Sequence, residues 1–549
     1  MQQNSSKSGP TESRLDATDA ASARADSSRV SFLNFFRFLV PSVADVLFVV
    51  LLFGLSAGAL GRLLLRDAGT GWHIRNGQQI LLTHAVPRVD SFSATMSGRP
   101  WYAWEWFYDL LMAAIHQALG LNGVVYYSAA IIAATFAIVL YFASMRGANL
   151  LITLFLLILS LGASAVHFLA RPHVVSWLLT VAWVELVDTA VTQPSRETAR
   201  RLFWLPALML LWVNVHGGFL FGLLLLAAYL AGAGIQYFSE PDARAASAYI
   251  LKRLGTVTLL CGAASFVNPY GYKLHVHVGH YLADRFLMNA ISEFRSPNFH
   301  GAAQQCFALL MLITIVALAS ARRRPHPAQM LAMLLAVYGG LFATRNLPVA
   351  SLLLTLLVAP LLSESLAAAG STAAAGWVRS ACAGVDRFGL RMRNTELRLS
   401  GHVWLVAGFV VGLWACAHGG RLGSEQLINA YFEPKRFPVE AVDVLAQRQV
   451  SEPVFSLDYW GGYLIYRRYP REKVFIDDRH DFYGDAYIKD YLKVTLAQPG
   501  WDKVLDAEHV NWVLTPTESS LSSLLRLSPA WKTVHEDSRA VLFERSEKP

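Results

Sequence analysis

Ionisable side chains interrupt this otherwise apolar sequence at a small number of places. The clearest is RDAGTGWHIRNGQQI, residues 66–80, which follows directly on the apolar run GRLLL. It presents Arg66, Asp67, Trp72 and His73 at the point where a membrane span would end. Ionisable groups at span ends or at membrane depth cost free energy, and they tend to line a cavity or a substrate path. This stretch therefore indicates a functional site.

Polar residues of later segments fall on the same side of the membrane as this stretch if the spans alternate in direction. The whole set is Asp67, His73, Asp90, Glu105, Arg171, His173, Asn214, His216, Asn268, Lys273, Glu293 and Arg345. Arg345 interrupts an otherwise apolar segment, and a guanidinium binds phosphate oxygens in a bidentate fork. Taken singly, each residue also has a simpler interpretation, in which it anchors a helix end at the membrane surface. Their joint pattern favours a shared site.

Two stretches rich in histidine and aspartate raise the question of a metal site. HVHVGH holds His275, His277 and His280. The first two would share a face only in a strand, and no nearby carboxylate completes a ligand set, so we expect no metal there. IDDRHD holds Asp477, Asp478, His480 and Asp481. It is either a site for a divalent ion or for an acceptor, or a solvated strand end.

Composition places the chain in a membrane. Of the 549 residues 54% are hydrophobic and 16% are charged, with a mean hydropathy of +0.37. These values exclude an ordinary soluble protein. The net charge of +8 is typical of basic cytoplasmic loops and does not indicate nucleic-acid binding. The four cysteines fit neither a disulfide framework nor a zinc site. Residues 1–38 form a largely polar tail. We expect it to be disordered and cytosolic, and to contain no cleavable signal peptide.

Apolar runs predict about eleven membrane helices between residues 39 and 419. They lie near 43–65, 124–144, 149–170, 174–191, 203–215, 217–237, 254–268, 302–320, 328–343, 347–364 and 402–418. With a cytosolic N-terminus, every basic loop falls on one side, as the positive-inside rule requires. Those loops carry Arg146; Arg196, Arg200 and Arg201; Lys252 and Arg253; Arg322–Arg324; and Arg379–Arg398. A long first outer loop, residues 66–122, then faces the outside.

The last segment, residues 420–549, is expected on the outer side as a small α/β domain. Four alternating apolar stretches, PVFSL, KVFID, VNWVL and AVLFE, predict strands, and amphipathic stretches between them predict helices. The predicted fold class is therefore mostly α: a polytopic membrane helix bundle with a C-terminal extracytoplasmic α/β cap.

Two stretches resemble a known superfamily. The first outer loop, DAGTGWHIRNGQQI followed by PRVDSFSATMSGRPWYAWEW, is similar to that of the polytopic C-type glycosyltransferases, which include protein mannosyltransferases, aminoarabinose transferases and the oligosaccharyltransferase catalytic subunit. In the cap, SLDYWGGYLIYRRYPREKVFIDDRHDFYG resembles the oligosaccharyltransferase WWDYG motif with its following strand ending in Asp. Here DYWGG replaces WWDYG, so recognition of an Asn-X-Ser/Thr sequon is not implied.

The resemblance implies roles for several residues. Asp67 corresponds to the catalytic acidic residue that activates the acceptor; the alternative is that it pairs with Arg66 or caps the next helix. Arg345 is expected to bind the donor phosphate, with Arg171, His173, His216 and Lys273 as further candidates. Acceptor or sugar binding is expected from Asp90, Glu105, Glu293, Asp458, Tyr459 and Trp460. Trp72, Trp101, Trp104 and Trp106 either stack on a sugar or form an interfacial belt.

The implied activity is transfer of a sugar from a polyprenyl-phosphate donor to an envelope glycolipid, glycan or protein at the outer face of a bacterial cytoplasmic membrane, with inversion. Partners are then the lipid-linked donor, membrane lipids and the acceptor. No cofactor is expected, although a pyrophosphate donor would call for a divalent metal. Two other functions stay open: a transporter of an envelope precursor, which should show inverted repeats and a path through the bundle, and a non-catalytic scaffold.

Overall fold

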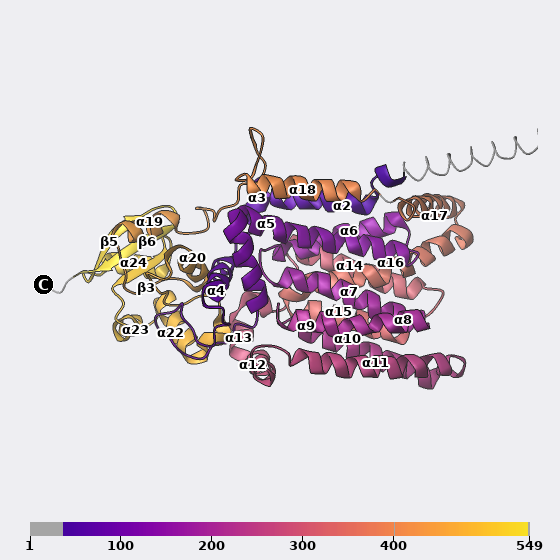
Figure 1. Ribbon diagram of the computed structural model, residues 1–549, viewed down its shortest axis with the longest axis horizontal. Coiled ribbons are helices and arrows are strands. Elements are labelled where there is room, and N and C mark those ends of the chain that lie inside the picture. The colour runs from indigo at the N-terminus through magenta and orange to yellow at the C-terminus, as the bar shows by residue number, and fades with distance from the viewer. Residues whose placement is uncertain (1–36, 400, 547–549) are drawn as a thin grey trace, which may run out of the picture.

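The computed structural model describes residues 37–399 and 401–546. The predicted cytosolic tail, residues 1–38, lies almost wholly outside the described residues. Helices form a long bundle, and a smaller unit with a sheet, here called the cap (residues 421–546), sits at one end of it (Figure 1). The mostly helical class with a small C-terminal sheet is confirmed, whereas an independent cap domain beginning at residue 420 stays a prediction.

Each of the predicted apolar runs forms a helix of the bundle. These helices are α2 (Val43–Ser56), α5 (Trp106–Met145), α6 (Leu150–Ser164), α7 (His173–Thr192), α9 (Leu205–Val213), α10 (Phe219–Ser239), α11 (Arg244–Ser265), α14 (Ala302–Ser320), α15 (Pro327–Phe342), α16 (Leu347–Thr372) and α18 (Val403–Ala417). Within the described ranges, 7 helices are long and apolar enough to cross a membrane, and α15 and α18 are apolar but shorter. The chain is therefore a multi-pass membrane protein.

Helix α5 departs most from the prediction. It begins at Trp106, although its apolar run was predicted to begin near residue 124, and it is 40 residues long. Its backbone is interrupted at Gly120, where φ is 62° and ψ is −160°, a conformation that glycine adopts without steric cost. The amphipathic segment before Gly120 escaped the hydropathy pattern. The helix before this kink was not predicted, but the apolar part of α5 follows Gly120, close to the predicted start near 124, and the predicted loop bounds of 66–122 stay a prediction.

Shorter helices connect the spans at the two ends of the bundle. At the cap end they are α3 (Gly58–Leu63), α4 (Gly69–Thr83), α12 (Tyr272–Ala283), α13 (Arg285–Ala290) and the 3-10 turns η1 (Ala165–His167), η4 (Ser292–Phe294) and η5 (Thr344–Asn346). At the other end they are α8 (Arg196–Arg201), α17 (Gly376–Glu396), η2 (Leu202–Trp204) and η3 (Pro241–Ala243). The cap-end helices are the ones that build the site described below.

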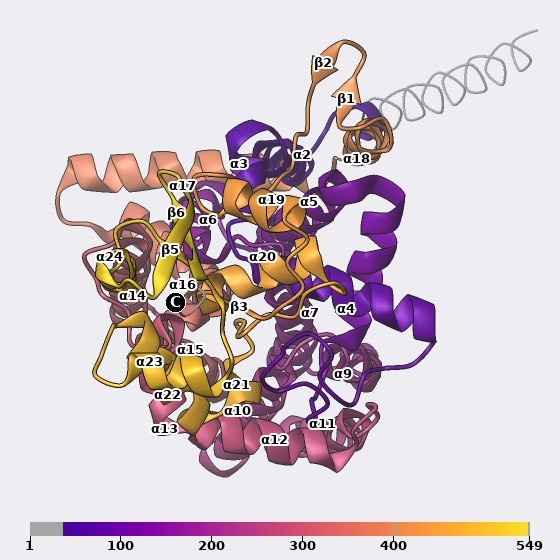
Figure 2. The same ribbon diagram turned by 90° about the vertical axis from the view of Figure 1, so that its left-hand side faces the viewer.

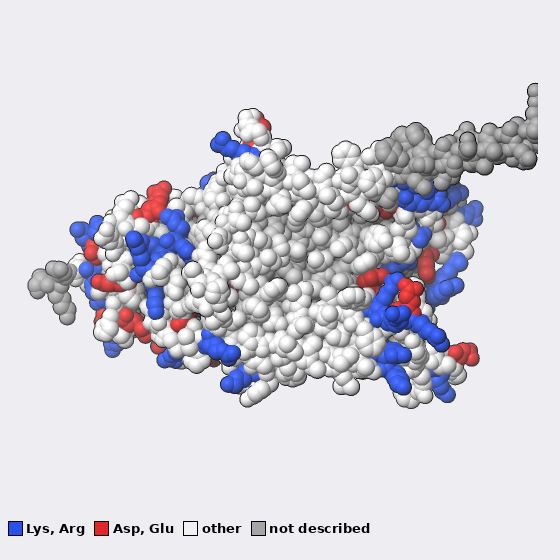
Figure 3. Space-filling view, viewed as in Figure 1, with Lys and Arg blue, Asp and Glu red and all other residues white. Residues whose placement is uncertain are grey.

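Charged side chains gather at the two ends of the molecule and leave an almost uncharged belt between them (Figure 3). The arginine-rich helices α8 and α17 both lie at the end away from the cap (Figure 1). This distribution is the one that the positive-inside rule predicted, although the direction of the molecule in a membrane stays a prediction. Arg146 is not a free loop charge: its Nη2 lies 2.8 Å from Glu185 Oε2 and its Nη1 lies 2.9 Å from Asp188 Oδ2.

The cap contains a four-stranded sheet in the order β3-β4-β6-β5. Its strands are β3 (Val454–Phe455), β4 (Trp512–Pro516), β5 (Trp531–Glu536) and β6 (Ala540–Arg545). β3 and β4 are parallel, and β6 pairs antiparallel with both β4 and β5. The sheet is flanked by α19 (Val439–Gln447), α20 (Asp458–Arg468), α21 (His480–Tyr483), α22 (Asp485–Thr495), α23 (Trp501–Ala507) and α24 (Ser520–Leu527).

Three of the four predicted strands are confirmed, since PVFSL, VNWVL and AVLFE overlap β3, β4 and β6. Strand β5 and the hairpin of β1 (Arg421–Leu422) and β2 (Glu425–Gln426) were missed, because their side chains are mostly polar and exposed. KVFID forms no regular strand. Its Val474 makes isolated parallel bridges with Val454 on one side and with Ser93 on the other.

The first outer loop thereby becomes part of the cap. The Val474 N–H donates to Phe92 O over 3.0 Å, and Val474 O accepts from the Ala94 N–H over 2.9 Å. The Thr95 hydroxyl donates to Phe475 O over 2.9 Å. These backbone contacts fix the height of the loop above the bundle.

Helices α4 and α20 approach each other through glycines at the cap end (Figure 2). A Cβ atom on Gly462 would lie 2.3 Å from Ala68 O, and one on Gly71 would lie 2.3 Å from Gly462 O. On Gly461 it would lie 2.3 Å from Ile476 O. Gly461 and Gly462 thus permit a close approach between the backbones. It presses the cap directly onto the segment that follows Asp67.

Candidate functional site

A cavity of about 470 Å³ lies between the cap end of the bundle and the cap. Its polar half is lined by residues from seven short segments of the sequence: Trp72, Trp101, Trp104, Glu105, His167, Arg171, His173, His216, Glu293, Arg345 and, from the cap, Asp478, Arg479, His480 and Asp481. Six predicted site residues therefore meet here: Glu105, Arg171, His173, His216, Glu293 and Arg345. The joint pattern that the sequence indicated corresponds to one cavity.

Arg171 lies at the junction of bundle and cap. Its Nη1 donates to Asp67 Oδ1 over 2.8 Å and to Asp478 Oδ2 over 2.6 Å. Burial lowers the pKa of Arg171, but the Asp67 and Asp478 carboxylates more than offset this and raise it well above its ordinary value. In the described part of the chain neither Nε nor Nη2 of Arg171 has a hydrogen-bond partner, and the side chain lines the cavity. Arg171 is thus a cation held in place by two carboxylates, and its Nε and Nη2 groups are available to donate hydrogen bonds in the cavity.

The two carboxylates on Arg171 are themselves held. The Gly69 N–H donates to Asp67 Oδ1 over 2.8 Å, and the Trp72 indole donates to Asp478 Oδ1 over 2.8 Å. The sequence left open whether Asp67 caps the next helix or pairs with Arg66. Asp67 does accept a hydrogen bond from the start of α4, but its ion-pair partner is Arg171, because Arg66 instead donates to Ala165 O.

Glu105 stands at the N-terminus of α5 between two histidine rings. Its Oε2 lies 3.7 Å from His73 Nε2, and its Oε1 lies 3.8 Å from His216 Nε2. On its far side His73 Nδ1 is 2.5 Å from Asp109 Oδ1, which fixes that ring. Burial raises the pKa of Glu105 to about 8. The nearby Asp481 and Asp478 raise this pKa further, whereas Arg171 and Arg345 lower it and only partly oppose the effect of burial. A carboxyl group with such a pKa exchanges protons near neutral pH.

Both histidines beside Glu105 are neutral. Burial, followed by the positive charge of Arg345 and Arg171, lowers the pKa of His216 to about 3. Burial and Arg171 likewise hold the pKa of His73 well below its usual range. His216 Nδ1 accepts from the Gly218 N–H over 3.1 Å and lies 2.8 Å from the Ser176 hydroxyl, which itself accepts from the Trp212 indole. Its proton is therefore on Nε2, the atom that faces Glu105.

Arg345 and Glu293 form a second charged group on the cavity wall. Arg345 Nη1 lies 3.7 Å from Glu293 Oε1, and its guanidinium lies 4.5 Å from the centre of the Phe294 ring. His167 Nε2 lies 3.6 Å from the other Glu293 oxygen. Burial raises the pKa of Glu293, but Arg345 and His167 outweigh it and hold that pKa below the ordinary range. The Glu293 carboxylate is therefore charged, and Arg345 is only loosely paired.

The other half of the cavity is apolar. It runs along α10, α15 and α16, where its lining includes Leu220, Phe221, Leu224, Leu335, Tyr338, Phe342 and Val349. Leu224, Tyr338 and Phe342 are 54%, 66% and 56% exposed, so this side is not closed by protein. These helices belong to the uncharged belt of the bundle. A chain of apolar groups can therefore extend from the polar half into the lipid.

The IDDRHD stretch is buried, so its interpretation as a solvated strand end is wrong. Arg479 donates to Asp477 Oδ1 over 2.8 Å and pairs with Asp90 Oδ1 at 2.8 Å. His480 Nε2 lies 2.7 Å from Asp458 Oδ2, and His277 Nε2 lies 2.9 Å from Asp481 Oδ2. Because the stretch packs against the first outer loop and α12, it carries the cap residues that line the cavity.

Several predicted site residues lie elsewhere. Asp90 is buried as the partner of Arg479 and does not line the cavity. Lys273 is exposed on the outer face of α12. Asp458 binds His480 and Tyr491, Tyr459 is 48% exposed, and Trp460 is buried in the cap, where its indole donates to Arg436 O over 3.0 Å. The DYWGG stretch begins helix α20, which turns these side chains into the cap or outward and leaves only its glycines facing α4.

The remaining aromatic and histidine candidates fall into different places, and one glycine of the site was not predicted. Trp72, Trp101 and Trp104 line the cavity, whereas the Trp106 indole donates to Asn214. HVHVGH is part of helix α12, so its histidines point in different directions and form no joint site. Gly69 was missed: a Cβ atom there would lie 1.5 Å from Arg171 Nη1 and 2.4 Å from Asp478 Oδ2. The only sequence signal for it was its place two residues after Asp67.

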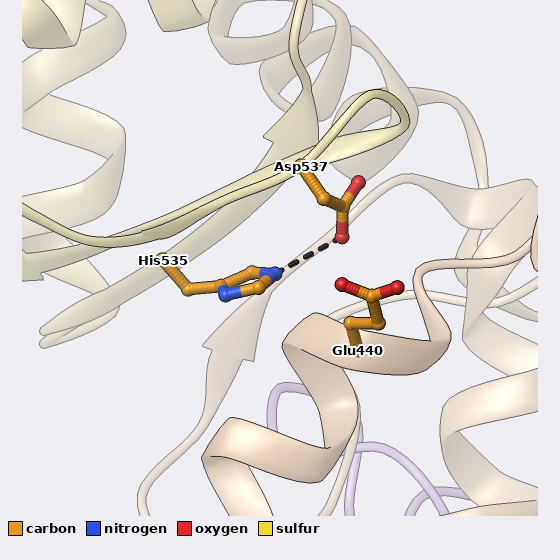
Figure 4. A group of neighbouring side chains, drawn as sticks. All are labelled: Glu440, His535 and Asp537. Atoms are coloured by element: carbon orange, nitrogen blue, oxygen red, sulfur yellow. Dashed lines mark hydrogen bonds and ion pairs between the residues drawn. The ribbon is translucent and has the colours of Figure 1, made fainter.

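Within the described residues, one group of three side chains has metal-ligand atoms that all lie within 4.8 Å of one another: Glu440, His535 and Asp537 (Figure 4). Glu440 comes from α19, His535 from β5, and Asp537 from the turn that follows β5. His535 Nε2 lies 3.0 Å from Asp537 Oδ2, and Glu440 is exposed. This group lies on the cap and contributes nothing to the cavity lining.

No protein-family model matches the chain, and no curated protein matches its sequence. Solved structures do match its fold. The apo oligosaccharyltransferase of Archaeoglobus fulgidus has a TM-score of 0.52 at 12% identity, over 87% of this chain and 69% of that one. The archaeal oligosaccharyltransferase AglB from Archaeoglobus fulgidus, in complex with an inhibitory peptide and a dolichol-phosphate, has a TM-score of 0.51 at 12% identity, over 86% and 69%. ArnT from Cupriavidus metallidurans bound to undecaprenyl phosphate has a TM-score of 0.45 at 14% identity, over 91% and 96%.

At these identities the likeness concerns the fold alone. The chain shares its fold with these oligosaccharyltransferase structures, which agrees with the resemblance noted in the sequence at the level of the fold.

Proposed function

We propose that this protein transfers a glycosyl group from a polyprenyl-phosphate donor to an envelope glycolipid, glycan or protein at the outer face of a bacterial cytoplasmic membrane. One observation carries the proposal. A single cavity joins guanidinium groups with free N–H donors, a buried carboxyl group that titrates near neutrality, and an apolar extension into the lipid belt. These are the three parts that such a donor and such a transfer require.

The donor phosphate is assigned to the space between Arg171 and Arg345. Arg171 offers Nε and Nη2, and the ion pair of Arg345 with Glu293 is loose at 3.7 Å. A guanidinium edge with two free N–H groups binds two phosphate oxygens at once. His173 and His216 line the same wall and keep their neutral rings near the phosphate. The isoprenoid chain then follows the apolar half of the cavity between α10 and α15.

The transfer itself is a displacement at the anomeric carbon. The acceptor oxygen forms a bond to that carbon while the bond to the phosphate oxygen breaks, and the electron pair leaves with the polyprenyl phosphate. The acceptor proton passes to a carboxylate. Attack from the face opposite the leaving phosphate inverts the configuration. Arg171 and Arg345 stabilise the charge that builds on the phosphate oxygens.

Two carboxylates are candidates for the base. Asp67 was predicted from the sequence, but its Oδ1 is engaged by Arg171 and by the Gly69 N–H, and it does not line the cavity. Glu105 lines the cavity and has a pKa of about 8. We favour Glu105 as the base and Asp67 as the residue that positions Arg171. Replacing each by its amide distinguishes them, as set out in the Discussion.

The competing functions make different demands. A transporter needs a polar path through the bundle, whereas the polar lining of this cavity ends at the cap end. A scaffold does not need Arg171 and Arg345 in one lipid-open cavity.

The deciding experiment incubates the purified full chain in nanodiscs with radiolabelled polyprenyl-phosphate sugars and envelope extract. Transfer of label to a non-polyprenyl product, lost in Arg345→Ala, supports the proposal. Equal product formation by the wild type and Arg345→Ala contradicts the assigned site, and an inert wild type contradicts the activity.

A further inference from the structure

We propose that the guanidinium of Arg171 occupies the position of a divalent cation between Asp67 and Asp478, so that this site performs its transfer without a metal ion. The inference deepens the proposed function and rests on it for its catalytic meaning. The geometry of the three side chains, however, can be tested without any transfer assay.

The first argument is positional. Asp67 comes from the segment between α3 and α4, and Asp478 comes from the cap, yet both direct an oxygen at the same nitrogen atom, at 2.8 and 2.6 Å. Carboxylate oxygens bind Mg²⁺ at about 2.0–2.1 Å and Ca²⁺ at about 2.3–2.6 Å, with the ion between them. A cation shared by these two carboxylates would need the space that Nη1 fills. The ion and the guanidinium exclude each other.

The second argument is that the place of the guanidinium is built into the fold. Gly69 has no side chain, and a Cβ atom there would lie 1.5 Å from Nη1. The Gly69 N–H and the Trp72 indole each bind one of the two carboxylates and so fix their orientation. The guanidinium therefore sits in a recess that the first turn of α4 leaves open for it.

The third argument concerns the ligands that a metal would find. Two carboxylates are present, but the neighbouring His173 directs its Nε2 to His167 O at 2.8 Å. Within the described ranges, the one group of three metal-type side chains within common reach is Glu440, His535 and Asp537, on the cap. The donor set at Arg171 thus fits a guanidinium, which needs only acceptors, better than it fits a hexacoordinate ion.

The consequence for the reaction is a cation that is covalently part of the protein. Arg171 Nη1 binds both carboxylates and offsets one of their two negative charges, while Nε and Nη2 have no partner among the described residues and can bind phosphate oxygens on the cavity side. A bound divalent ion would bridge carboxylates and phosphate in the same way. The single charge of Arg171 is half that of such an ion, and Arg345, which lines the same cavity, supplies a second positive charge.

Manganese binding, followed by electron paramagnetic resonance, tests the inference directly. The full-length protein in nanodiscs carries His535→Ala in every sample, so that the Glu440, His535 and Asp537 group on the cap cannot contribute a Mn²⁺ signal. This background is expected to bind no Mn²⁺ in the cavity. Arg171→Ala leaves two facing carboxylates without a cation, and it should gain a Mn²⁺ site that is lost again when Asp478→Asn is added.

Two outcomes of this experiment overturn the inference. One is Mn²⁺ bound to the background protein and released by Asp478→Asn. The other is a folded Arg171→Ala protein that binds no Mn²⁺. The Mn²⁺ concentrations for this test extend to those that saturate the cap group in a protein with native His535. If Arg171→Ala fails to fold, Arg171→Met, which keeps much of the side-chain volume but carries no charge, takes its place in the same comparison.

Transfer assays provide the second readout. The background protein should keep its full rate in EDTA. Arg171→Ala should lose roughly 10²- to 10³-fold in rate, the scale for removing one group that stabilises developing charge, and Mn²⁺ should restore part of it. Arg345→Ala should lose activity without rescue. A background protein that needs Mn²⁺ for transfer contradicts the inference but leaves the proposed function standing. An inactive background contradicts the proposed function, while manganese binding still decides the cation question.

Discussion

Glu105 Oε1 lies 3.8 Å from His216 Nε2, the nitrogen that carries the proton of a neutral ring. On the other side His73 Nε2, buried and without a hydrogen-bond partner among the described residues, lies 3.7 Å from Glu105 Oε2. Both separations are too long for a hydrogen bond, so neither histidine occupies a carboxylate oxygen, and the side chain lines the cavity. Glu105 is thus enclosed by neutral neighbours and open to the cavity.

The pH dependence of transfer follows from this enclosure. The pKa of Glu105 is about 8, so the fraction of carboxylate, and with it the rate, should rise from pH 6 towards pH 9. His216, with a pKa of about 3, does not titrate in this range. Glu105→Gln should lose about 10²- to 10⁴-fold in rate and the rising limb with it. A full set of kcat values against pH checks this, and an unchanged limb in Glu105→Gln would exclude Glu105 as the base.

Stability should change with pH in the opposite direction. In the folded protein Glu105 keeps its proton up to a pKa of about 8, whereas an unfolded glutamate releases it near ~4.3. Between these values the folded state binds the extra proton, so the free energy of unfolding falls as pH rises and levels off above pH 8. Glu105→Gln removes this dependence. Thermal unfolding in detergent at several pH values tests it, and parallel curves for both proteins would contradict the burial of Glu105.

The amide variant of Asp67 separates positioning from proton transfer. If Asp67 positions Arg171, Asp67→Asn weakens binding of polyprenyl phosphate as well as turnover, because Arg171 loses one of its two carboxylates. If Asp67 is the base, kcat falls by about 10²- to 10⁴-fold while donor binding persists. Isothermal titration with polyprenyl phosphate, beside the transfer assay, decides between the two. Arg345→Ala serves as the reference for lost phosphate binding.

Gly69→Ala tests whether the recess at α4 is needed. The added methyl group collides with the Arg171 guanidinium and with Asp478, and overpacking of this kind costs about 1–3 kcal/mol. Transfer should fall together with the unfolding temperature. Gly217→Ala is the matched control, since Gly217 also lines the cavity and a Cβ atom there meets nothing within 4 Å. Equal behaviour of the two variants would mean that the recess is not required.

The direction of the molecule in the membrane is tested by cysteine labelling. In a background without the native cysteines, Leu527→Cys in the cap and Glu197→Cys in α8 are both well exposed, at 84% for Leu527 and 74% for the Glu197 side chain. An impermeant maleimide applied to spheroplasts should label position 527 and should label position 197 only after permeabilisation. The reverse result would put the cap in the cytosol and remove the basis for an outer-face reaction.

The sequence predicted the bundle because each span is a local property. Twenty apolar residues form a membrane helix wherever they stand, so the apolar runs and the basic loops could be located without tertiary information. The prediction failed at the start of α5, where the helix before Gly120 is amphipathic and carries Tyr108 and Asp109. The hydropathy pattern predicts a loop at these residues, although their backbone is helical.

The site was only partly predictable for a different reason. Arg171 and Asp478 are 307 positions apart, and no spacing rule connects them. Arg345 and Glu105 were found because a charge in an apolar context is conspicuous. Trp460 was misassigned because a motif similarity gave it a role, whereas the start of α20 turned its ring into the cap. Gly69 carried no signal, since its function is to leave space.

The bridges of Val474 to both Val454 and Ser93 mean that the segment before α5 and the C-terminal unit share one hydrogen-bonded framework. Residues 421–546 are therefore not a portable module. A chimera that grafts them onto another bundle would leave Phe92 and Ala94 without their backbone partners, and it would seat IDDRHD above the wrong loop. Acceptor preference should be exchangeable between relatives of this fold only when residues 84–105 travel together with the cap.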